Sequence, residues 1–522
     1  MGTALSEPLP FVGEVPITAS RLSVALQAAQ VVGVGEEKGQ ETRTDELVAQ
    51  GIGSVTLFAS ALADPVAAAR RTTELQRLAQ RGPVGVPLLI SVDEEGGAVI
   101  RLPSGRTTLP SAMALGRVAA RHGLSEATRL AKTAARAVAG RLSALGIQCD
   151  LAPVCDLDLM DNPALGNRSF SADAEEAGAL AAAFAQGLAE GGVIAVAKHF
   201  PGHGATTVDS HQALPVLAVD RPVIEEREFV PFRATIAAGI PAIMTGHLAV
   251  PALDPSGTPA SLSPFVYETV RGSLGFRGLM VTDSLGMAGA AVAGGIGAAA
   301  VQALRAGADL VLVAHGPEEQ REVLEAIVSA VETGELPSPR LAAACDQVLA
   351  LKRRQALSRR PVPDEEAAPY LLDRPSDALL ALEIASAAVV ATGGPAVWVP
   401  DGGANVLLVH AGPSALLEAS RQQWPHAVAV AAGLERPEPG DLVVLLAAGG
   451  TMPSRATVDC LRAAADRAVA AGLRVLWLWT GAHWRSGMVE RQPMLSACDS
   501  TPASLHALLA RAGHPGRWAE GV

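Results

Sequence analysis

The sequence predicts an α/β protein in which a TIM (β/α)8 barrel is followed by a smaller α/β layered (αβα) domain. Two observations predict the barrel. Eight short apolar runs alternate with alanine-rich, helix-like stretches over about 330 residues, a pattern typical of parallel strands joined by helices. Ionisable residues follow six of the eight runs. That position corresponds to the C-terminal ends of the strands, where TIM barrels hold their functional side chains.

The eight predicted strands are rich in Val, Ile, Leu and Ala. They span residues 30–34, 54–58, 86–92, 147–154, 193–198, 242–245, 279–282 and 309–313. Helix signals lie between them. Residues 124–145 contain no proline and stop at Gly146, and Asp173 stands three residues before Glu176 in a capping-box-like start. A helix over about residues 339–356 is expected to close the barrel.

These signals divide the chain into four segments. We expect an irregular lead-in over 1–25, the barrel over 26–356, a linker over 357–376 and a C-terminal α/β domain over 377–522. Prolines and charges predict the linker, and further apolar runs at 405–410, 427–431, 441–447 and 474–479 predict the second sheet. The glycines near Gly402 do not form a G-x-G-x-x-G turn between a strand and a helix, so we expect no nucleotide site there.

Composition bears on the partners of the protein. The net charge of −12 disfavours binding to nucleic acid or to an anionic membrane, and no apolar run is long enough to span a bilayer. The first residues lack the basic and apolar regions of a secretory signal. Five scattered cysteines without C-x-x-C spacing are expected to be buried thiols in a reducing compartment. We therefore expect a cytoplasmic protein, and the sequence leaves its oligomeric state open.

The richest stretch for chemistry is the loop after the fifth predicted strand, which begins with the run Lys-His-Phe-Pro-Gly-His-Gly. Proline and glycine end the strand there and force a tight loop. The loop carries five ionisable candidates. They are Lys198, His199, His203, Asp209 and His211. A polar surface loop is the alternative interpretation, but functional groups gather on loops held by a rigid scaffold.

Asp209 and His211 form the most specific pair in this loop. In an extended segment, residues two apart point to the same side, so the carboxylate can accept a hydrogen bond from the imidazole. Such a partner fixes the tautomer and prepares the histidine for general acid/base catalysis. A metal site is the rival interpretation, because His and Asp are ligand types. We expect no metal, since Pro201 and Gly202 prevent a helical ligand pair and Lys198 would repel a cation.

Asp283 ends the seventh predicted strand, in the run Thr-Asp-Ser. A carboxylate held rigidly at a strand end suits a nucleophile, and an N-cap of the next helix is the alternative. His247, which follows the sixth predicted strand, and His203 are further site candidates.

Two arginine-bearing motifs complete the set of candidates. Asp93 opens the turn Asp-Glu-Glu-Gly-Gly, which is followed by Arg101, and Arg168 lies in the run Asn-Arg-Ser-Phe. A carboxylate on such a turn can accept hydrogen bonds from two neighbouring hydroxyls. Arg101 can serve the same ligand or neutralise Glu95, and either arginine can be structural.

Together the KHFPGHG run with its following DSH, the DEEGG turn with its arginine, NRSF and the TDS strand end resemble glycoside hydrolase family 3 over about residues 25–355. More narrowly, they resemble its β-N-acetylglucosaminidase branch. The resemblance implies that Asp283 is the nucleophile and that His211, with Asp209 as partner, is the acid/base. It also implies a set of sugar-contacting residues. They are Asp93, Arg101, Arg168, Lys198 and His199. Ala98 and Ser284 depart from the family, which often has a basic residue and a second acid at these positions.

The resemblance implies a retaining, exo-acting β-N-acetylglucosaminidase that works without a cofactor on a small carbohydrate, such as a peptidoglycan fragment recycled in the cytoplasm. Phosphorolysis is an alternative, because a histidine acid/base repels phosphate less than a Glu does. A β-glucosidase or β-xylosidase of the same family is another, although these generally take the acid/base from elsewhere and lack the DSH element. An inactive sugar-binding barrel would not need Asp283, Asp209 and His211 together.

Overall fold

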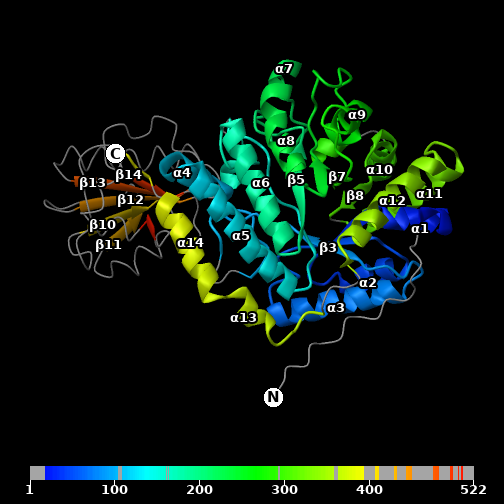
Figure 1. The fold of residues 1–522 in the computed structure, drawn as a ribbon, viewed down its shortest axis with the longest axis horizontal. Helices are drawn as coiled ribbons and strands as arrows, with labels where there is room; N and C mark the ends of the chain where they lie inside the picture. Colours follow the sequence, from blue (N-terminus) through cyan, green and yellow to red (C-terminus); the bar gives the residue numbers. More distant parts are fainter. Residues whose placement is uncertain are drawn as a thin grey trace.

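The computed structural model describes residues 18–103, 108–159, 162, 164–291, 294–314, 316–357 and 362–388, the backbone of six strands between 390 and 497, and Ser504, Ala507 and Leu508. Eight parallel strands close into a barrel in chain order (Figure 1). They are β1 Val32–Glu36, β2 Ser54–Leu57, β3 Leu89–Val92, β4 Cys149–Asp150, β5 Ile194–Phe200, β6 Ala242–Thr245, β7 Leu279–Ser284 and β8 Leu310–Val313. The predicted barrel is confirmed.

Helices surround the barrel and link its strands (Figure 1). They are α1 Val24–Gln30, α2 Glu41–Ala49, α3 Pro65–Arg81, α4 Ala112–His122, α5 Leu124–Ala144, α6 Ala174–Glu190, α7 Arg221–Val223, α8 Phe229–Ala237, α9 Pro264–Gly272, α10 Gly295–Ala306, α11 Pro317–Glu332 and α12 Ser338–Arg354. The predicted helix over 124–145 is α5, and Gly146 follows it with φ +70°. Asp173 caps α6 by accepting a hydrogen bond from the Glu176 N–H at 2.9 Å.

Alternation along the strands explains how the barrel is filled. Ile194 and Val196 of β5 belong to one buried cluster together with Leu279 and Val281 of β7, and this cluster lies inside the barrel. The intervening residues, such as Ala195 and Met280, belong to the larger cluster between strands and helices. Strand side chains alternate between two faces, and both faces of a closed parallel sheet are covered. The strands are therefore apolar over most of their length, as the short apolar runs predicted, and the charged side chains of β5 and β7 lie toward their C-terminal ends.

Several strand boundaries differ from the prediction, and two of these differences have a local cause in the sequence. The first strand begins two residues later than expected, because Gln30 is the last residue of α1, whose N-cap Ser23 accepts from Leu26 N–H. The fourth strand is shorter than the predicted 147–154. Pro153 has no N–H to donate to a neighbouring strand, and an isolated bridge joins Val154 to Lys198 beyond it.

Part of the segment predicted as a linker is helical. It contains α13 Ala368–Leu372 and the start of α14 Pro375–Ala388. Leu372, Leu380 and Ile384 are buried in the barrel's outer core, so these helices pack as part of the first domain, with α14 against α4 (Figure 1). Residues 358–361, and residues 1–17 of the predicted lead-in, lie outside the described residues.

A second sheet has the strand order β11-β10-β12-β13-β14-β9, with β9 antiparallel to β14 and the other pairs parallel. Its strands are β9 Val390–Thr392, β10 Val406–His410, β11 Val428–Ala431, β12 Leu442–Ala448, β13 Arg474–Thr480 and β14 Met494–Ala497. The four runs predicted for this domain correspond to β10, β11, β12 and β13. The sequence around Gly402 lies outside the described residues.

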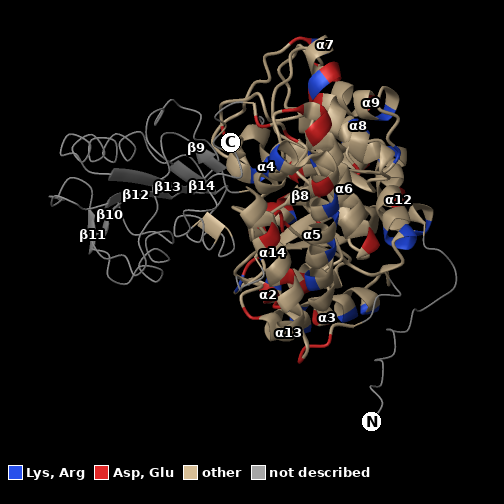
Figure 2. Ribbon diagram, turned by 60° about the vertical axis from the view of Figure 1, so that its left-hand side comes forward, with Lys and Arg blue, Asp and Glu red and all other residues tan. Residues whose placement is uncertain are grey.

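Charged residues of both signs are mixed along the outer helices of the barrel (Figure 2). No helix in the described part of the chain has the length and apolar character needed to cross a bilayer. The described cysteines, Cys149, Cys155 and Cys345, are buried free thiols, as predicted, and Cys460 and Cys498 lie outside the described residues.

Candidate active site

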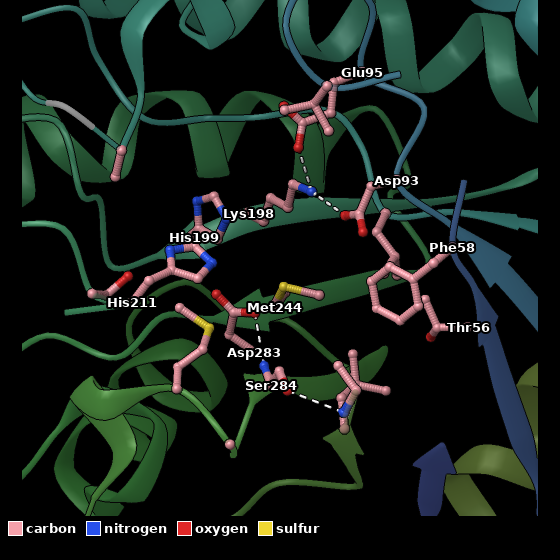
Figure 3. A pocket seen from close by; sticks show the side chains of 18 of the residues that line it. Thr56, Phe58, Asp93, Glu95, Lys198, His199, His211, Met244, Asp283 and Ser284 are labelled. Atoms are coloured by element: carbon pink, nitrogen blue, oxygen red, sulfur yellow. Dashed lines mark hydrogen bonds and ion pairs between the residues drawn. The ribbon is translucent and has the colours of Figure 1, made fainter. Parts of the chain in front are cut away.

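A pocket of about 400 Å³ opens at the C-terminal ends of the barrel strands. Eight of the ten predicted site residues line it. They are Asp93, Arg101, Arg168, Lys198, His199, His203, His211 and Asp283. Figure 3 shows Asp93, Lys198, His199, His211 and Asp283 around the pocket. Asp209 does not line the pocket but is hydrogen-bonded to His211, and His247 is buried outside the pocket lining. The barrel therefore gathers residues that are up to 190 positions apart in the chain, the separation of Asp93 and Asp283 (283 − 93).

The local backbone at the end of β7 positions Asp283 in the pocket. The pairing of β7 with β8 shifts register between Val281 and Ser284, and consecutive residues Asp283 and Ser284 both line the pocket. The carboxylate accepts a hydrogen bond from the Ser284 N–H at 2.7 Å. Asp283 caps no described helix, since Met287 and Gly294 hold the N-cap positions that follow. The N-cap alternative for this residue is therefore wrong.

The electrostatic surroundings keep the Asp283 carboxyl ionised. Burial acts to raise its pKa, but the nearby His199 and His247 rings, the Ser284 N–H and the Lys198 ammonium together bring the pKa below its usual range. At neutral pH the group is a carboxylate, which is the form that can attack an electrophilic carbon.

Lys198 bridges two carboxylates in the pocket wall (Figure 3). Its Nζ lies 2.7 Å from Asp93 Oδ1 and 2.6 Å from Glu95 Oε1. Burial acts to lower the pKa of Lys198, but Asp93 and Glu95 outweigh it and raise the pKa. Glu95 also receives a two-pronged contact from Arg168, at 2.7 and 2.8 Å. These partners hold the pKa of Glu95 far below its usual range despite burial.

Arg101 does not neutralise Glu95. Its backbone N–H, together with that of Leu102, donates to the carboxylate of Glu94, at 2.8 and 3.0 Å. Glu94 is buried and closes the turn that carries Asp93 and Glu95, while the Arg101 side chain lines the pocket. Instead, Glu95 is neutralised by Arg168, which lies 73 positions away from it in the chain.

His199 belongs to a buried Asp–His pair. Its Nδ1 donates to Asp156 Oδ2 at 2.6 Å, and Asp156 Oδ1 also accepts from the backbone N–H groups of His199 and His203, at 3.3 and 2.6 Å. Burial acts to raise the pKa of Asp156, but these donors, chiefly His199, lower it. A register shift between Ala197 and Phe200 in the pairing of β5 with β6 accompanies the exposure of both Lys198 and His199 to the pocket.

His203 continues this network. Its Nδ1 lies 2.6 Å from Thr206 Oγ1 and 3.2 Å from the side-chain amide nitrogen of Asn162. The amide nitrogen can only donate, so Nδ1 is the acceptor and Nε2 carries the hydrogen. Burial lowers the pKa of His203, in agreement with a neutral ring. The sequence predicted no role for Asp156 beyond its place after an apolar run. Its hydrogen bonds to His199 and His203 were not predicted, because these partners lie 43 and 47 positions away in the chain.

Asp209 and His211 form a second Asp–His pair, as predicted, but by a different geometry. The loop is a turn and not an extended segment: Asp209 Oδ1 accepts from the His211 backbone N–H at 2.9 Å and from its Nδ1 at 2.8 Å. The His211 side chain is 65% exposed, whereas that of Asp209 is 20% exposed. Burial acts to raise the pKa of Asp209, and the two hydrogen bonds from His211 more than offset it.

His247 does not line the pocket. It is fully buried, with Nε2 donating to the Ser284 carbonyl oxygen at 2.9 Å and Nδ1 2.7 Å from Ser261 Oγ. The Oγ of Ser284 accepts a hydrogen bond from the Ala314 N–H at 3.1 Å. Within the described residues, no three His, Cys, Asp or Glu side chains are grouped so as to hold a metal ion.

Comparisons with known proteins agree with this barrel and this residue set. A model of the glycosyl hydrolase family 3 N-terminal domain matches residues 23–351. A beta-hexosaminidase of Chromobacterium violaceum is 38% identical over 305 residues, which cover 58% of this chain and 83% of that protein. The solved structure of a family 3 β-N-acetylglucosaminidase from Paenibacillus sp. superposes with a TM-score of 0.81 at 30% identity, covering 94% of this chain and 96% of that one.

A further solved structure is also similar. An enzyme from Neisseria gonorrhoeae, solved in complex with N-trifluoroacetyl-D-glucosamine, is 30% identical with a TM-score of 0.55, and the alignment covers 69% of this chain and 98% of that one. The family model spans the barrel from before α1 to within α12, which is more than half of the chain. The chain therefore belongs to glycosyl hydrolase family 3 and is a glycoside hydrolase built on a TIM barrel.

Proposed function

We propose that the protein is a retaining, exo-acting β-N-acetylglucosaminidase that hydrolyses terminal β-linked N-acetylglucosamine from glycosides such as peptidoglycan fragments. One observation carries the proposal: an ionised carboxylate, Asp283, lines the same pocket as a histidine, His211, that is oriented by a carboxylate. The names of the relatives support the substrate class, since they are a beta-hexosaminidase and a β-N-acetylglucosaminidase.

The proposed first step forms a covalent glycosyl-enzyme. Asp283 attacks the anomeric carbon, the bond from that carbon to the leaving oxygen breaks, and His211 as imidazolium gives its proton to that oxygen. In the second step, water attacks the anomeric carbon, neutral His211 takes the proton of the water, and the bond to Asp283 breaks. Two inversions at one carbon leave the product with the β configuration of the substrate.

The remaining residues of the pocket would hold the sugar. Asp93 and His199 offer hydrogen-bonding groups for sugar hydroxyls, and Arg101, Arg168 and Lys198 offer donors. The volume of about 400 Å³ lies toward the lower end of the range of about 300–1,000 Å³ typical of ligand pockets. Such a pocket suits one terminal sugar, in keeping with exo action.

Phosphorolysis is the second candidate, and the histidine favours it. A neutral imidazole carries no negative charge during the lifetime of the glycosyl-enzyme, so it repels a phosphate ion less than a glutamate would. In that case phosphate would replace water, and the product would be a sugar phosphate. We also propose a cytoplasmic role in the recycling of cell-wall fragments.

A panel of nitrophenyl β-glycosides tests the proposal. The N-acetylglucosaminide should be cleaved faster than the glucoside and the xyloside, and NMR should detect the β anomer of the sugar first. The same assay with phosphate separates the two candidates, because phosphorolysis would produce N-acetylglucosamine 1-phosphate. Preference for the glucoside or xyloside, or first release of the α anomer, would contradict the proposal.

A further inference from the structure

The loop that carries the Asp209–His211 pair is anchored at the residue between them. Ser210 is buried, with 5% of its surface exposed, although the side chain of His211 is 65% exposed. The Ser210 carbonyl oxygen accepts a hydrogen bond from the Gly289 N–H at 3.0 Å. Gly289 lies in the 3₁₀ turn η5, Ala288–Ala290, which follows β7. The proposed acid/base loop is thus tied to the segment that follows the proposed nucleophile.

This contact leaves little room for a side chain on Gly289. A Cβ atom there would lie 3.0 Å from both Cβ and the carbonyl oxygen of His247, and 3.1 Å from the Ser210 oxygen itself. Carbon atoms at such separations are closer than the optimum for non-bonded contact. A residue without Cβ therefore lets the backbone approach Ser210 and His247 together.

His247 forms the back of this contact and also braces the end of β7. The Ser284 carbonyl can only accept, so His247 Nε2 carries the hydrogen that it donates at 2.9 Å. Its Nδ1 is then the acceptor for the Ser261 hydroxyl at 2.7 Å. The His247 ring thus supports Ser284, the residue after Asp283, and His247 also packs against Gly289, which donates to Ser210.

We propose that Gly289 and His247 form a seat for Ser210, and that this seat sets the position of the Asp209–His211 pair relative to Asp283. The inference rests on the proposed function of His211 as the acid/base. Gly289 and His247 are positioning residues in this account, because neither lines the pocket. A shift of the seat should therefore impair proton transfer and leave the binding of the sugar in place.

Gly289→Ala in the full-length protein tests the seat, with Gly272→Ala as the matched control. Gly272 ends α9, and a Cβ there would meet no atom within 4 Å. Gly289→Ala should lower kcat/KM on a β-linked N-acetylglucosamine disaccharide by on the order of 10- to 100-fold, since misplaced catalytic groups cost factors of that size. Cleavage of an activated nitrophenyl glycoside, whose leaving group needs no proton, should fall by less than about threefold in the first step.

The inhibition constant for N-acetylglucosamine should stay at the wild-type value in Gly289→Ala, and Gly272→Ala should match the wild type in every assay. Equal loss on both leaving groups, or wild-type activity on the disaccharide, would overturn the seat. His211→Ala is measured in parallel. If that variant shows no dependence on the leaving group, the proposed acid/base fails, which is a different result from failure of the seat.

Hydrogen exchange tests the seat without relying on the folding of a variant. In the wild type, the Gly289 amide should exchange slowly because it donates to Ser210 in a buried contact. Rapid exchange of this amide would overturn the proposal.

Discussion

Two Asp–His pairs contribute histidines to one pocket, and they differ in how they are held. In the pair Asp156–His199, the two side chains are 0% and 10% exposed, and the oxygen and nitrogen are 2.6 Å apart. In the pair Asp209–His211, they are 20% and 65% exposed, and the distance is 2.8 Å. The first pair joins the segment that follows β4 to the end of β5. The second lies within one turn of a loop.

The difference indicates a division of labour between the pairs. Asp156 receives three hydrogen bonds from His199 and His203, so its histidine has a fixed place beside Asp283. A fixed ring suits binding and electrostatic support of the nucleophile. His211 depends on a single carboxylate and faces solvent, so it can exchange protons with water and with a departing group. We therefore expect damage to the buried pair to affect all substrates, and damage to the exposed pair to depend on the leaving group.

The largest effect on activity is expected at Asp283, because both pairs are proposed to act together with this nucleophile. Asp283→Ala should lower turnover of every glycoside by on the order of 10³-fold or more, because no other group replaces the attacking carboxylate. The fold should persist, since the side chain makes a single hydrogen bond to its own neighbour. A slow fluorinated glycoside should label this residue in the wild type, and labelling of a different carboxylate would contradict the assignment.

Breaking the buried pair should produce the next largest effect. Asp156→Asn replaces an acceptor of three hydrogen bonds with a neutral amide that cannot serve both His199 Nδ1 and the two backbone N–H groups equally well. We expect kcat/KM to fall by about 10²-fold, by a similar factor for nitrophenyl and sugar leaving groups, together with a lower Tm. A loss confined to sugar leaving groups would mean that the buried pair moves the proton.

Breaking the exposed pair should produce a smaller and more selective effect. Asp209→Asn should lower kcat/KM by about tenfold on a disaccharide and leave the first step of nitrophenyl release nearly unchanged, because His211 keeps its ring but loses its oriented partner. The Tm should fall only slightly, and by much less than in Asp156→Asn, since ion pairs in contact with solvent contribute little to stability. A large fall in Tm would show that the loop, and not the proton donor, had been damaged.

The dependence of stability on pH should be the smallest effect and should differ between the pairs. The pKa of Asp156 is lower in the folded protein than its ordinary value of 3.8, so the pair stabilises the fold above that pH and ceases to do so as pH falls through the folded pKa. The Tm difference between wild type and Asp156→Asn should thus be full above about pH 4 and shrink below it. Asp209→Asn should show the same direction with a smaller amplitude. A difference that grows on acidification would contradict this sign.

Local contacts in this site could be predicted from the sequence, whereas distant ones could not. Asp209 and His211 are two residues apart, and their contact follows from spacing alone, although the turn that produces it was not foreseen. The strand ends that carry Lys198 and Asp283 followed from apolar runs ending in polar residues. These predictions rest on periodicity and turn chemistry, which act over a few residues.

The partners across the barrel required the structure, because strand register and barrel closure decide them. Glu95 is the centre of the Lys198–Arg168 cluster, yet its sequence context favoured Arg101, which is closer in the chain. Similarly, His247 follows a strand like its counterparts, but it is buried and donates to the Ser284 carbonyl instead of lining the pocket. No spacing rule distinguishes a histidine that faces the pocket from one that supports it.

Azide rescue of His211→Ala and His199→Ala tests the division between the two pairs most directly. With a nitrophenyl β-N-acetylglucosaminide, His211→Ala should form the glycosyl-enzyme and stall, because water lacks its base. Azide needs no base, so it should restore turnover and yield a glycosyl azide of β configuration. His199→Ala should be slow in the first step, and azide should not accelerate it. Rescue of His199→Ala, with no rescue of His211→Ala, would assign proton transfer to the buried pair and contradict the account.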